Sequence, residues 1–412
     1  MVHSIATSLE NPGKSFFPGA HLLVDPGETL ARVKPFMAKM GITRIANVTG
    51  LDRIGIPVVM VCRPNSRSIA VSQGKGYTLD AAKASGLMES MESWHAERIE
   101  LPLRLGSVED LSHKYRLVNV DRLPAMRGSV FHRSLPILWV EGVDLMDQGK
   151  TWLPYELVHT YYTRPAPAGS GCFAQSSNGL ASGNHALEAL SHAICEIIER
   201  DASSLWYQQC RARRDATRLD PDSIDDDSCR DLITRIRAAG LSVVIWNTTS
   251  DIGIPSFECA ILDRPGTFAH PGLGAGCHPD KSVALARALV EAVQVRTTYI
   301  AGSRDDLTHE EYSYAAVKDK NRVFREMAGQ TVGSVNYSSI PHQRFATFRE
   351  DLDWILDRLR SAGIDEVVCV DLSKPEFEIP VVRVVIPGLE GPHDDDSYLP
   401  GPRARSIVDG DR

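Results

Sequence analysis

Residues 243 to 265 read V-V-I-W-N-T-T-S-D-I-G-I-P-S-F-E-C-A-I-L-D-R-P. Two runs rich in β-branched and aromatic residues flank a polar turn, and the second run follows the pair Ile254 and Pro255. Proline is tolerated at the first position of a strand, because it need not donate a ladder hydrogen bond there. The stretch therefore predicts a β-hairpin.

The same pattern recurs from Arg44 and from Val367, again with an Ile-Pro pair before the second run, and a looser version covers residues 137 to 158. An amphipathic segment that ends at a glycine precedes each of the three clear copies, as expected for a helix and its stop. These segments are residues 28–41, 231–240 and 351–363. The repetition predicts an α/β fold of helix–hairpin units with a mixed or antiparallel sheet, not a doubly wound parallel sheet.

The bulk composition is that of a soluble globular enzyme, with 412 residues, 43% hydrophobic and 24% charged. A net charge of −8 argues against a general nucleic-acid binder. The chain has neither a signal-peptide core nor an apolar run of about 20 residues, so we expect a cytoplasmic protein without a membrane partner. Its eight cysteines are scattered without a C-x-x-C pair, which predicts free thiols and disfavours zinc or iron–sulfur sites.

No clean linker divides the chain, and we expect one compact unit with subdomains. The predicted parts are an N-terminal α/β subdomain (1–70), a core (71–310) and a C-terminal α/β subdomain with a polar, proline-rich tail (311–412). Residues 302–345 are expected to be the most loop-like part. The tail from about residue 391 has few apolar residues, so we expect it not to pack firmly.

Three glycine-containing runs each precede a helix with charged residues. They are S-Q-G-K-G from Ser72, G-L-G-A-G from Gly272, and S-S-N-G-L-A-S-G-N from Ser176. We interpret each run as a turn that leads into the helix. The polar residues on the three helices are Ser85, Glu89 and Glu92; Arg287, Glu291 and Gln294; and Glu188, Glu196 and Glu199.

The helix predicted over residues 186 to 202 has one acidic face. At about 100° per residue, Glu188, His192, Glu196 and Glu199 fall on one side, and the leucines and isoleucines fall on the other. A solvated face is one explanation, because like charges on an exposed helix cost only about 0.2–0.5 kcal/mol per pair. A cation site is the other, because carboxylate oxygens suit Mg²⁺. His192 is interpreted as a hydrogen-bonding member of this face, not as a general base.

The spacing of the acids favours the cation site. Glu89 lies thirteen residues after Gly76 and Glu196 thirteen residues after Gly183, and each acid belongs to an E-x-x-E pair. Together with Arg287, this predicts three charged helix faces that converge on a magnesium–nucleotide site.

Other sites fit less well. N-P-G-K-S lacks the first glycine of a Walker loop, G-L-G-A-G lacks the third glycine of the dinucleotide fingerprint, and a di-iron site needs E-x-x-H pairs.

Three runs resemble the YcaO family. They are S-x-x-x-E-x-x-E at 85–92, S-N-G-L-A-S-G-N with the following E-x-x-E-R-D at 177–201, and H-P-D-K-S-V-A-L-A-R-A-L-V-E-A-V-Q-V-R at 278–296. The resemblance covers residues 25–300 and extends more weakly to 390. The run G-I-T-R-I-A-N-V-T-G-L-D-R-I-G-I-P is similar to standalone members that pair with a TfuA protein.

The resemblance implies ATP-dependent activation of a peptide backbone amide, with ATP and Mg²⁺ as cofactors. It implies that Glu89, Glu92, Glu188, Glu196 and Glu199 hold Mg²⁺ and position ATP. Ser85, Asn184, Arg200, Arg287 and Glu291 would line the nucleotide, with Lys75 a further contact to phosphate or substrate. Thr29 is a weaker candidate for a nucleotide contact, and no residue is identified as catalytic.

The tail departs from one branch of the family. Azoline-forming members commonly end in P-x-P-x-P, whereas here the tail breaks after P-G-P and continues for ten residues. Thioamide formation with a TfuA-like sulfur-delivery partner is therefore favoured. The alternatives are an azoline-forming cyclodehydratase with a ThiF-like leader-binding partner, and a nucleotide-binding accessory protein for methylthiolation of a ribosomal protein. The resemblance also implies a peptide or protein substrate and a homodimer.

Overall fold

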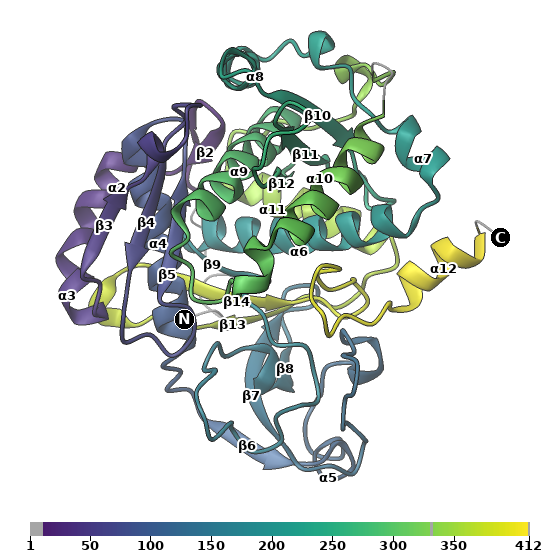
Figure 1. Cartoon of the computed structure of the whole chain (residues 1–412). Coiled ribbons are helices and arrows are strands. Elements are labelled where there is room, and N and C mark those ends of the chain that lie inside the picture. Colours follow the sequence, from purple (N-terminus) through teal and green to yellow (C-terminus); the bar gives the residue numbers. More distant parts are fainter. Residues whose placement is uncertain (1–10, 330–332, 411–412) are drawn as a thin grey trace. The chain divides into compact units, whose positions relative to one another are not determined.

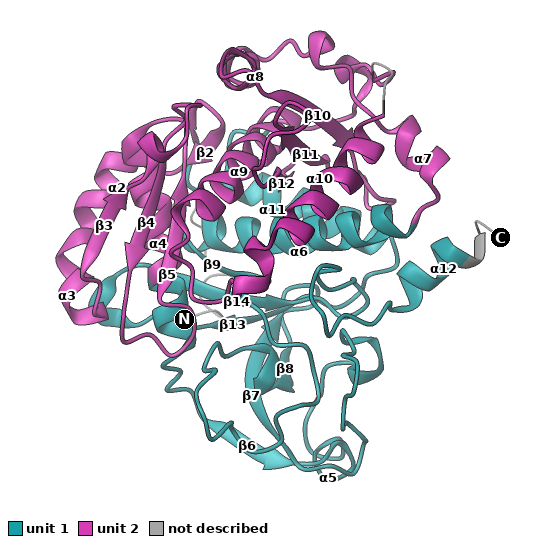
Figure 2. Ribbon diagram, viewed as in Figure 1, with its two compact units in different colours: residues 1–14, 91–208, 345–412 teal, residues 15–90, 209–344 magenta. Residues whose placement is uncertain are grey.

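The computed structural model describes residues 11–329 and 333–410 (Figure 1). By its internal contacts the chain divides into two compact units, each assembled from separate stretches of sequence (Figure 2). Unit 1 comprises residues 1–14, 91–208 and 345–412, and unit 2 comprises residues 15–90 and 209–344. The sequence predicted three consecutive subdomains, which divide the chain differently from these two units. That division stays a prediction. The first ten residues, where no signal segment is predicted, lie outside the described residues.

Unit 2 contains two three-stranded antiparallel sheets of the same design. In each sheet a predicted hairpin supplies two strands, and the next segment of chain supplies the third. The first sheet has the order β3 (Arg44–Asn47), β4 (Val58–Cys62), β5 (Val71–Lys75), and the second has β10 (Ser242–Asn247), β11 (Ser256–Leu262), β12 (Gly272–Cys277).

A helix precedes and another follows each sheet of unit 2. Gly41 and Gly240 end the preceding helices with φ near +73°, the left-handed conformation that favours glycine. The predicted helix stops are therefore confirmed. The preceding helices are α2 (Pro26–Val33) with α3 (Met37–Met40), and α8 (Asp227–Ala238); the following ones are α4 (Leu79–Ala96) and α9 (Lys281–Ala301). A short hairpin of β1 (Ser15–Phe17) and β2 (Ala20–Leu22) opens the unit.

The interpretation of the glycine-rich runs S-Q-G-K-G and G-L-G-A-G as turns is wrong, because all their residues except Gly76 lie in strands β5 and β12. Alternate glycines of β12 face α9, whose backbone lies directly on the strand. A Cβ at these positions would come within 2.0–2.3 Å of helix carbonyl oxygens: Gly272 against Ala292, Gly274 against Ala288, and Gly276 against Ala284. Two residues of a strand span about 6.6 Å, and four residues of a helix span about 6 Å. Every second residue of β12 therefore faces every fourth residue of α9.

The first sheet uses the same close contact. A Cβ at Gly74 of β5 would lie 1.9 Å from the carbonyl oxygen of Ala82 and 2.4 Å from the amide nitrogen of Gly86, both on α4. In both sheets glycine is required because the helix backbone, not a flexible side chain, occupies the space.

Residues 302–345 are less loop-like than expected, because they contain α10 (Tyr314–Ala328). Val317, Asn321 and Phe324 form its buried stripe, and Ser313 caps its first turn by accepting a hydrogen bond from the Ala316 amide. The many lysines and arginines between these buried positions conceal the stripe in the sequence. The unit also contains the short helix α7 (Arg211–Ala216).

Unit 1 is built on a six-stranded antiparallel sheet. Its order is β6 (Leu103–Gly106), β7 (Ile137–Asp144), β13 (Val368–Asp371), β14 (Val381–Val385), β9 (Leu180–Ser182), with β8 (Lys150–Pro154) also paired to β7. The predicted hairpins β7–β8 and β13–β14 are confirmed. The helices of the unit are α5 (Val108–Leu111), α6 (Ala186–Gln208), α11 (Phe348–Ser361) and α12 (Pro402–Gly410).

A third copy of the three-stranded design is present in unit 1, but distant segments form it. Strand β9 leads into α6, and its pairing partner is β14, about 200 residues later in the chain. Helix α6 packs on both strands. The third strand therefore comes before the hairpin in sequence, whereas it follows the hairpin in unit 2.

The C-terminal tail packs on unit 1, so the expectation that it would not pack firmly is wrong. Helix α12 contacts α6, and Ala404 is fully buried. Arg403 donates from Nε and Nη2 to the buried Asp201 carboxylate at 3.0 Å, and the Ala404 amide donates to Glu390. Polar contacts, which apolar composition does not reveal, fix the tail.

Candidate active site

Three of the predicted site residues meet in unit 2. Lys75, the last residue of β5, donates from Nζ to Glu291 Oε2 on α9 at 2.5 Å. It also attracts the Glu89 carboxylate of α4. The close packing of the helices on Gly74 and Gly274 brings these side chains to the two strands.

Glu89 and Glu291 occupy equivalent places in the two sheets. The Gln73 amide of β5 lies 3.4 Å from Glu89 Oε1, and the Ala275 amide of β12 lies 3.5 Å from Glu291 Oε1. In both cases the acid follows the strand amide by 16 residues. The structure therefore relates these two acids by the internal repeat.

The Glu89 carboxyl is suited to hold a cation. The residue is open to solvent, yet surrounding protein desolvates it enough to raise its pKa above the usual value, against the attraction of Lys75 and Arg304. A carboxylate in this state gains from a divalent cation, which would keep it ionised. Carboxylate oxygens are also the ligands that Mg²⁺ prefers.

A second group of predicted residues lies in unit 1. Glu92 lies one helical turn beyond Glu89 on α4, whose residues from Met91 onward belong to unit 1. It accepts hydrogen bonds from the amide and the hydroxyl of Ser182 at 2.8 and 2.7 Å. The Asn184 amide lies 3.3 Å from Glu188 Oε2 at the start of α6. These contacts tie the acids to the end of β9 and to the loop that follows it.

The acidic face of α6 is not a solvated one. Glu188 and Glu199 are buried, Glu196 is half-buried, and only His192 is exposed. Glu199 lies 3.6 Å from Arg200.

A residue that the sequence analysis missed, Arg383 of β14, is buried in the same unit and attracts Glu196. A lone arginine in the apolar run V-V-R-V-V was the available signal.

The contacts described above do not include the predicted residues Ser85, Arg287 and Thr29. Ser85 and Arg287 are half-buried on α4 and α9. Thr29 is buried on α2, with its hydroxyl 3.5 Å from the Asp25 carbonyl oxygen.

Within residues 11–329 and 333–410, no three His, Cys, Asp or Glu side chains form a ready metal cluster. Mg²⁺ does not require one, because it is commonly bound by one or two carboxylates together with substrate phosphates.

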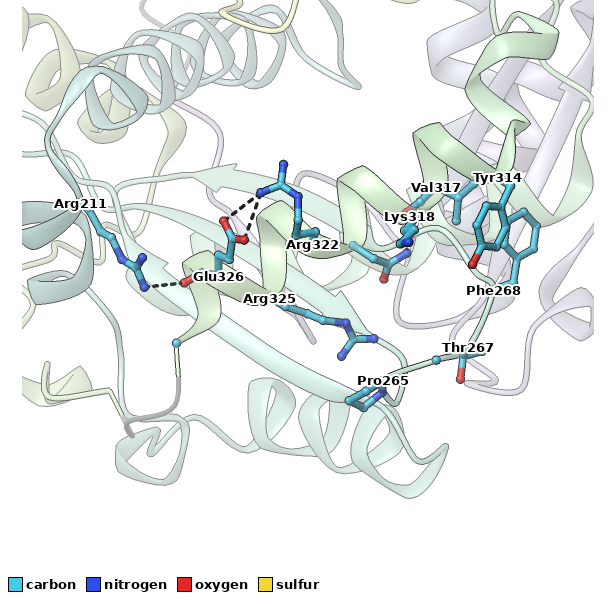
Figure 3. A pocket seen from close by; sticks show the side chains of 13 residues that line it. Arg211, Pro265, Thr267, Phe268, Tyr314, Val317, Lys318, Arg322, Arg325 and Glu326 are labelled. Atoms are coloured by element: carbon cyan, nitrogen blue, oxygen red, sulfur yellow. Dashed lines mark hydrogen bonds and ion pairs between the residues drawn. The ribbon is translucent and has the colours of Figure 1, made fainter.

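One cavity of unit 2 lies elsewhere, and none of the predicted site residues lines it. It is a groove along α10, where Phe268 and Tyr314 stack in parallel (Figure 3). Arg325, which also lines it, donates to the Asp263 carbonyl oxygen in the loop before β12. All eight cysteines are free thiols, as predicted. In the described part of the chain, no helix is long and apolar enough to cross a membrane.

Two relatives cover most of the chain. A protein of Rhizobium leguminosarum bv. trifolii, described as an uncharacterized protein in the tfuA 3′ region, is 36% identical over 381 residues, or 89% of this chain and 88% of the relative. An uncharacterized protein of Methanothermobacter thermautotrophicus is 34% identical over 380 residues, or 89% of this chain and 94% of the relative.

Solved structures share the fold. A heterocyclase in complex with substrate and cofactor matches with a TM-score of 0.76 at 20% identity, over 93% of this chain and 54% of the heterocyclase. YcaO from Methanopyrus kandleri, bound with AMPPCP and Mg²⁺, matches with a TM-score of 0.74 at 22% identity, over 94% of this chain and 98% of that one. The α/β fold inferred from the sequence is confirmed.

The family model described as YcaO cyclodehydratase, ATP- and Mg²⁺-binding, matches residues 73–390. This match includes all the predicted site residues except Thr29. The chain therefore belongs to the YcaO family, and its cofactors are ATP and Mg²⁺.

Proposed function

We propose that the protein uses ATP to activate a backbone amide of a peptide or protein and that it converts this amide to a thioamide. Membership of a cyclodehydratase family supports the amide chemistry. The observation that carries the choice of thioamide is the relative in the tfuA 3′ region, which matches over 88% of its length.

The proposed reaction removes a poor leaving group. Sulfide adds to the amide carbon, the amide oxygen is phosphorylated by ATP, and the oxygen then leaves as phosphate with the carbon–oxygen bonding electrons. One amide, one hydrogen sulfide and one ATP give one thioamide, one ADP and one phosphate. Such chemistry needs positioning and charge neutralisation, not a covalent nucleophile from the protein.

The predicted residues would divide this work between phosphate and metal. The proposed metal ligands are the acids Glu89, Glu92, Glu188, Glu196 and Glu199. Bound there, Mg²⁺ would neutralise phosphate charge. Lys75, Ser85, Asn184, Arg200, Arg287 and Glu291 would contact the nucleotide. The pairing of Lys75 with Glu291 supports this role for Lys75, because the ion pair holds its ammonium at the end of β5.

The nucleotide part of the proposal is tested without a substrate. Titration calorimetry with ATP should show binding that depends on Mg²⁺. Well-folded protein without metal-dependent affinity would contradict the ATP site.

The reaction is tested by mass spectrometry. The protein is incubated with a candidate peptide, a TfuA-like partner, Mg-ATP and sulfide. A thioamide adds the mass difference between sulfur and oxygen, and the gain must disappear without sulfide and with the Glu196→Ala variant. Loss of one water without sulfide would instead identify an azoline former, the second candidate, which the family's description as cyclodehydratase favours. No mass change while ATP still binds would support an accessory protein.

The proposed partners follow from the same experiment. A TfuA-like protein would deliver sulfur, whereas a ThiF-like protein would bind a leader peptide, and only the first should be required for thioamide formation. We also propose a homodimer, which sedimentation would test.

A further inference from the structure

Arg383 of β14 is a buried cation that forms no ion pair within 4 Å among the described residues. Only 3% of the residue is exposed. Its Nη2 donates to the Ser176 carbonyl oxygen at 2.8 Å. Its Nε and Nη1 have no hydrogen-bond partner among the described residues. This guanidinium is therefore fixed at one corner and leaves donors on its other two nitrogens.

Such an arrangement is costly for the fold alone. Buried polar groups are almost always hydrogen-bonded, and a buried ion loses several kcal/mol of hydration free energy. The other four residues of β14 are buried valines, so an apolar side chain would suit this strand. Burial lowers the pKa of Arg383 to about 10, which leaves it charged at neutral pH. Arginine at this position therefore points to a ligand.

The surroundings of Arg383 indicate which kind of ligand it binds. Glu196 of α6, one of the proposed metal-binding acids, lies close enough to attract the guanidinium. Phosphate oxygens bind both to arginine and to a Mg²⁺ ion that such a carboxylate would hold. The planar fork of arginine also matches phosphate oxygens, with two parallel hydrogen bonds.

We propose that Arg383 binds the phosphoryl group that ATP transfers, an assignment that rests on the proposed function. During transfer the amide oxygen forms a bond to the γ-phosphorus, and the bond from that phosphorus to the bridging oxygen breaks. ADP leaves with the electron pair of the broken bond. Negative charge spreads over the other γ-oxygens, where the donors of Nε and Nη1 stabilise it. The Ser176 carbonyl holds the third nitrogen in place.

The affinities for two ligands distinguish binding of the transferred phosphoryl group from binding of the nucleotide alone. Mg-AMPPCP mimics bound ATP, and Mg-ADP with orthovanadate mimics the phosphoryl group in transfer. For Arg383→Met we expect the Kd of the vanadate complex to rise about 10²–10³-fold and that of AMPPCP less than about tenfold. Arg383→Lys should restore part of the loss, because it keeps the charge without the fork. Equal losses for both ligands, or no loss for vanadate, would overturn the assignment.

A matched variant tests for a merely structural role. Arg403 is a second arginine of unit 1, but its Nε and Nη2 both bond to Asp201. Arg403→Met should lower the melting temperature, because it leaves a buried carboxylate unpaired. Arg383→Met should keep or raise the melting temperature, because it removes a buried cation that has no ion pair among the described residues. A similar fall in both variants that Arg383→Lys does not reverse would refute the proposal. If Arg383→Met does not fold, the affinities of Arg383→Lys for the two ligands decide.

The two proposals fail in different ways. If the wild-type protein binds no Mg-AMPPCP, the proposed function fails and the role of Arg383 fails with it. If the wild-type protein binds both ligands and the Arg383 variants bind them equally well, only the role of Arg383 fails.

Discussion

Replacing Gly274 by alanine tests how the strand–helix contact of unit 2 controls the proposed site. The new Cβ would lie 2.3 Å from both the Ala288 carbonyl oxygen and the Ala292 amide nitrogen, whereas ordinary contact begins at 3.4 Å. Helix α9 must therefore move away from β12 by about 1 Å. Overpacking costs about 1–3 kcal/mol, and occasionally more, when the obstacle cannot rotate away.

The expected loss for Gly274→Ala is about 3 kcal/mol, because both obstructing atoms belong to the helix backbone. Since 1 kcal/mol shifts the melting temperature by roughly 2–4 °C in units of 150–250 residues, calorimetry should show a fall of roughly 6–12 °C. The helix carries Glu291, so a displacement of about 1 Å should also lower ATP turnover about 10²-fold.

Gly50→Ala is the matched control in the same unit. No atom lies within 4 Å of a Cβ built at Gly50, and its backbone does not need the left-handed conformation. Its effect should stay within about 0.5 kcal/mol. If Gly274→Ala has the same melting temperature and the same ATP turnover as Gly50→Ala, the position of α9 does not depend on this contact. The reasoning is then wrong.

Three further results are expected. Glu89→Ala and Glu196→Ala should each abolish Mg²⁺-dependent phosphate release without lowering the melting temperature; an unfolded or fully active variant would show a structural or solvated acid. Truncation after Pro392 should lower the free energy of unfolding by about 3–5 kcal/mol, because Arg403 no longer pairs with Asp201; an unchanged denaturation midpoint would contradict the tail contacts. Burial raises the pKa of Asp201 from 3.8 to about 6, so its ionisation opposes folding. The stability of wild type relative to Asp201→Asn should fall by up to about 3 kcal/mol as pH rises from 4 to 6, and a flat difference in urea titrations would refute this.

Local patterns predicted the hairpins and the helices before them. The Ile-Pro pairs, the alternating apolar runs and the terminal glycines depend on neighbouring residues, and the structure confirms them at β3–β4, β10–β11 and β13–β14. The third strands were missed for a physical reason. Glycine signals a turn in isolation, whereas in β5 and β12 it makes room for a helix backbone that the local sequence does not reveal.

Contacts between distant residues limited the prediction of the site. The acids were proposed from their spacing on helices, but the ion pair of Lys75 with Glu291 joins residues 216 positions apart. Arg383 was missed because its one signal, a lone arginine in the run V-V-R-V-V, does not show whether the side chain is buried or lies exposed on an edge strand. The tail was misjudged because the partners of Arg403 and Ala404 lie on α6 and at Glu390.

The pairing of β9 with β14 has a consequence for biosynthesis. Strand β9 is complete at residue 182, but its partner begins only at residue 381. At about 5–20 residues per second, a ribosome needs roughly 10–40 s to supply that partner. During this interval the edge of β9 and the apolar side of α6 cannot reach their native partner, so the nascent chain should depend on chaperones until its last strands emerge.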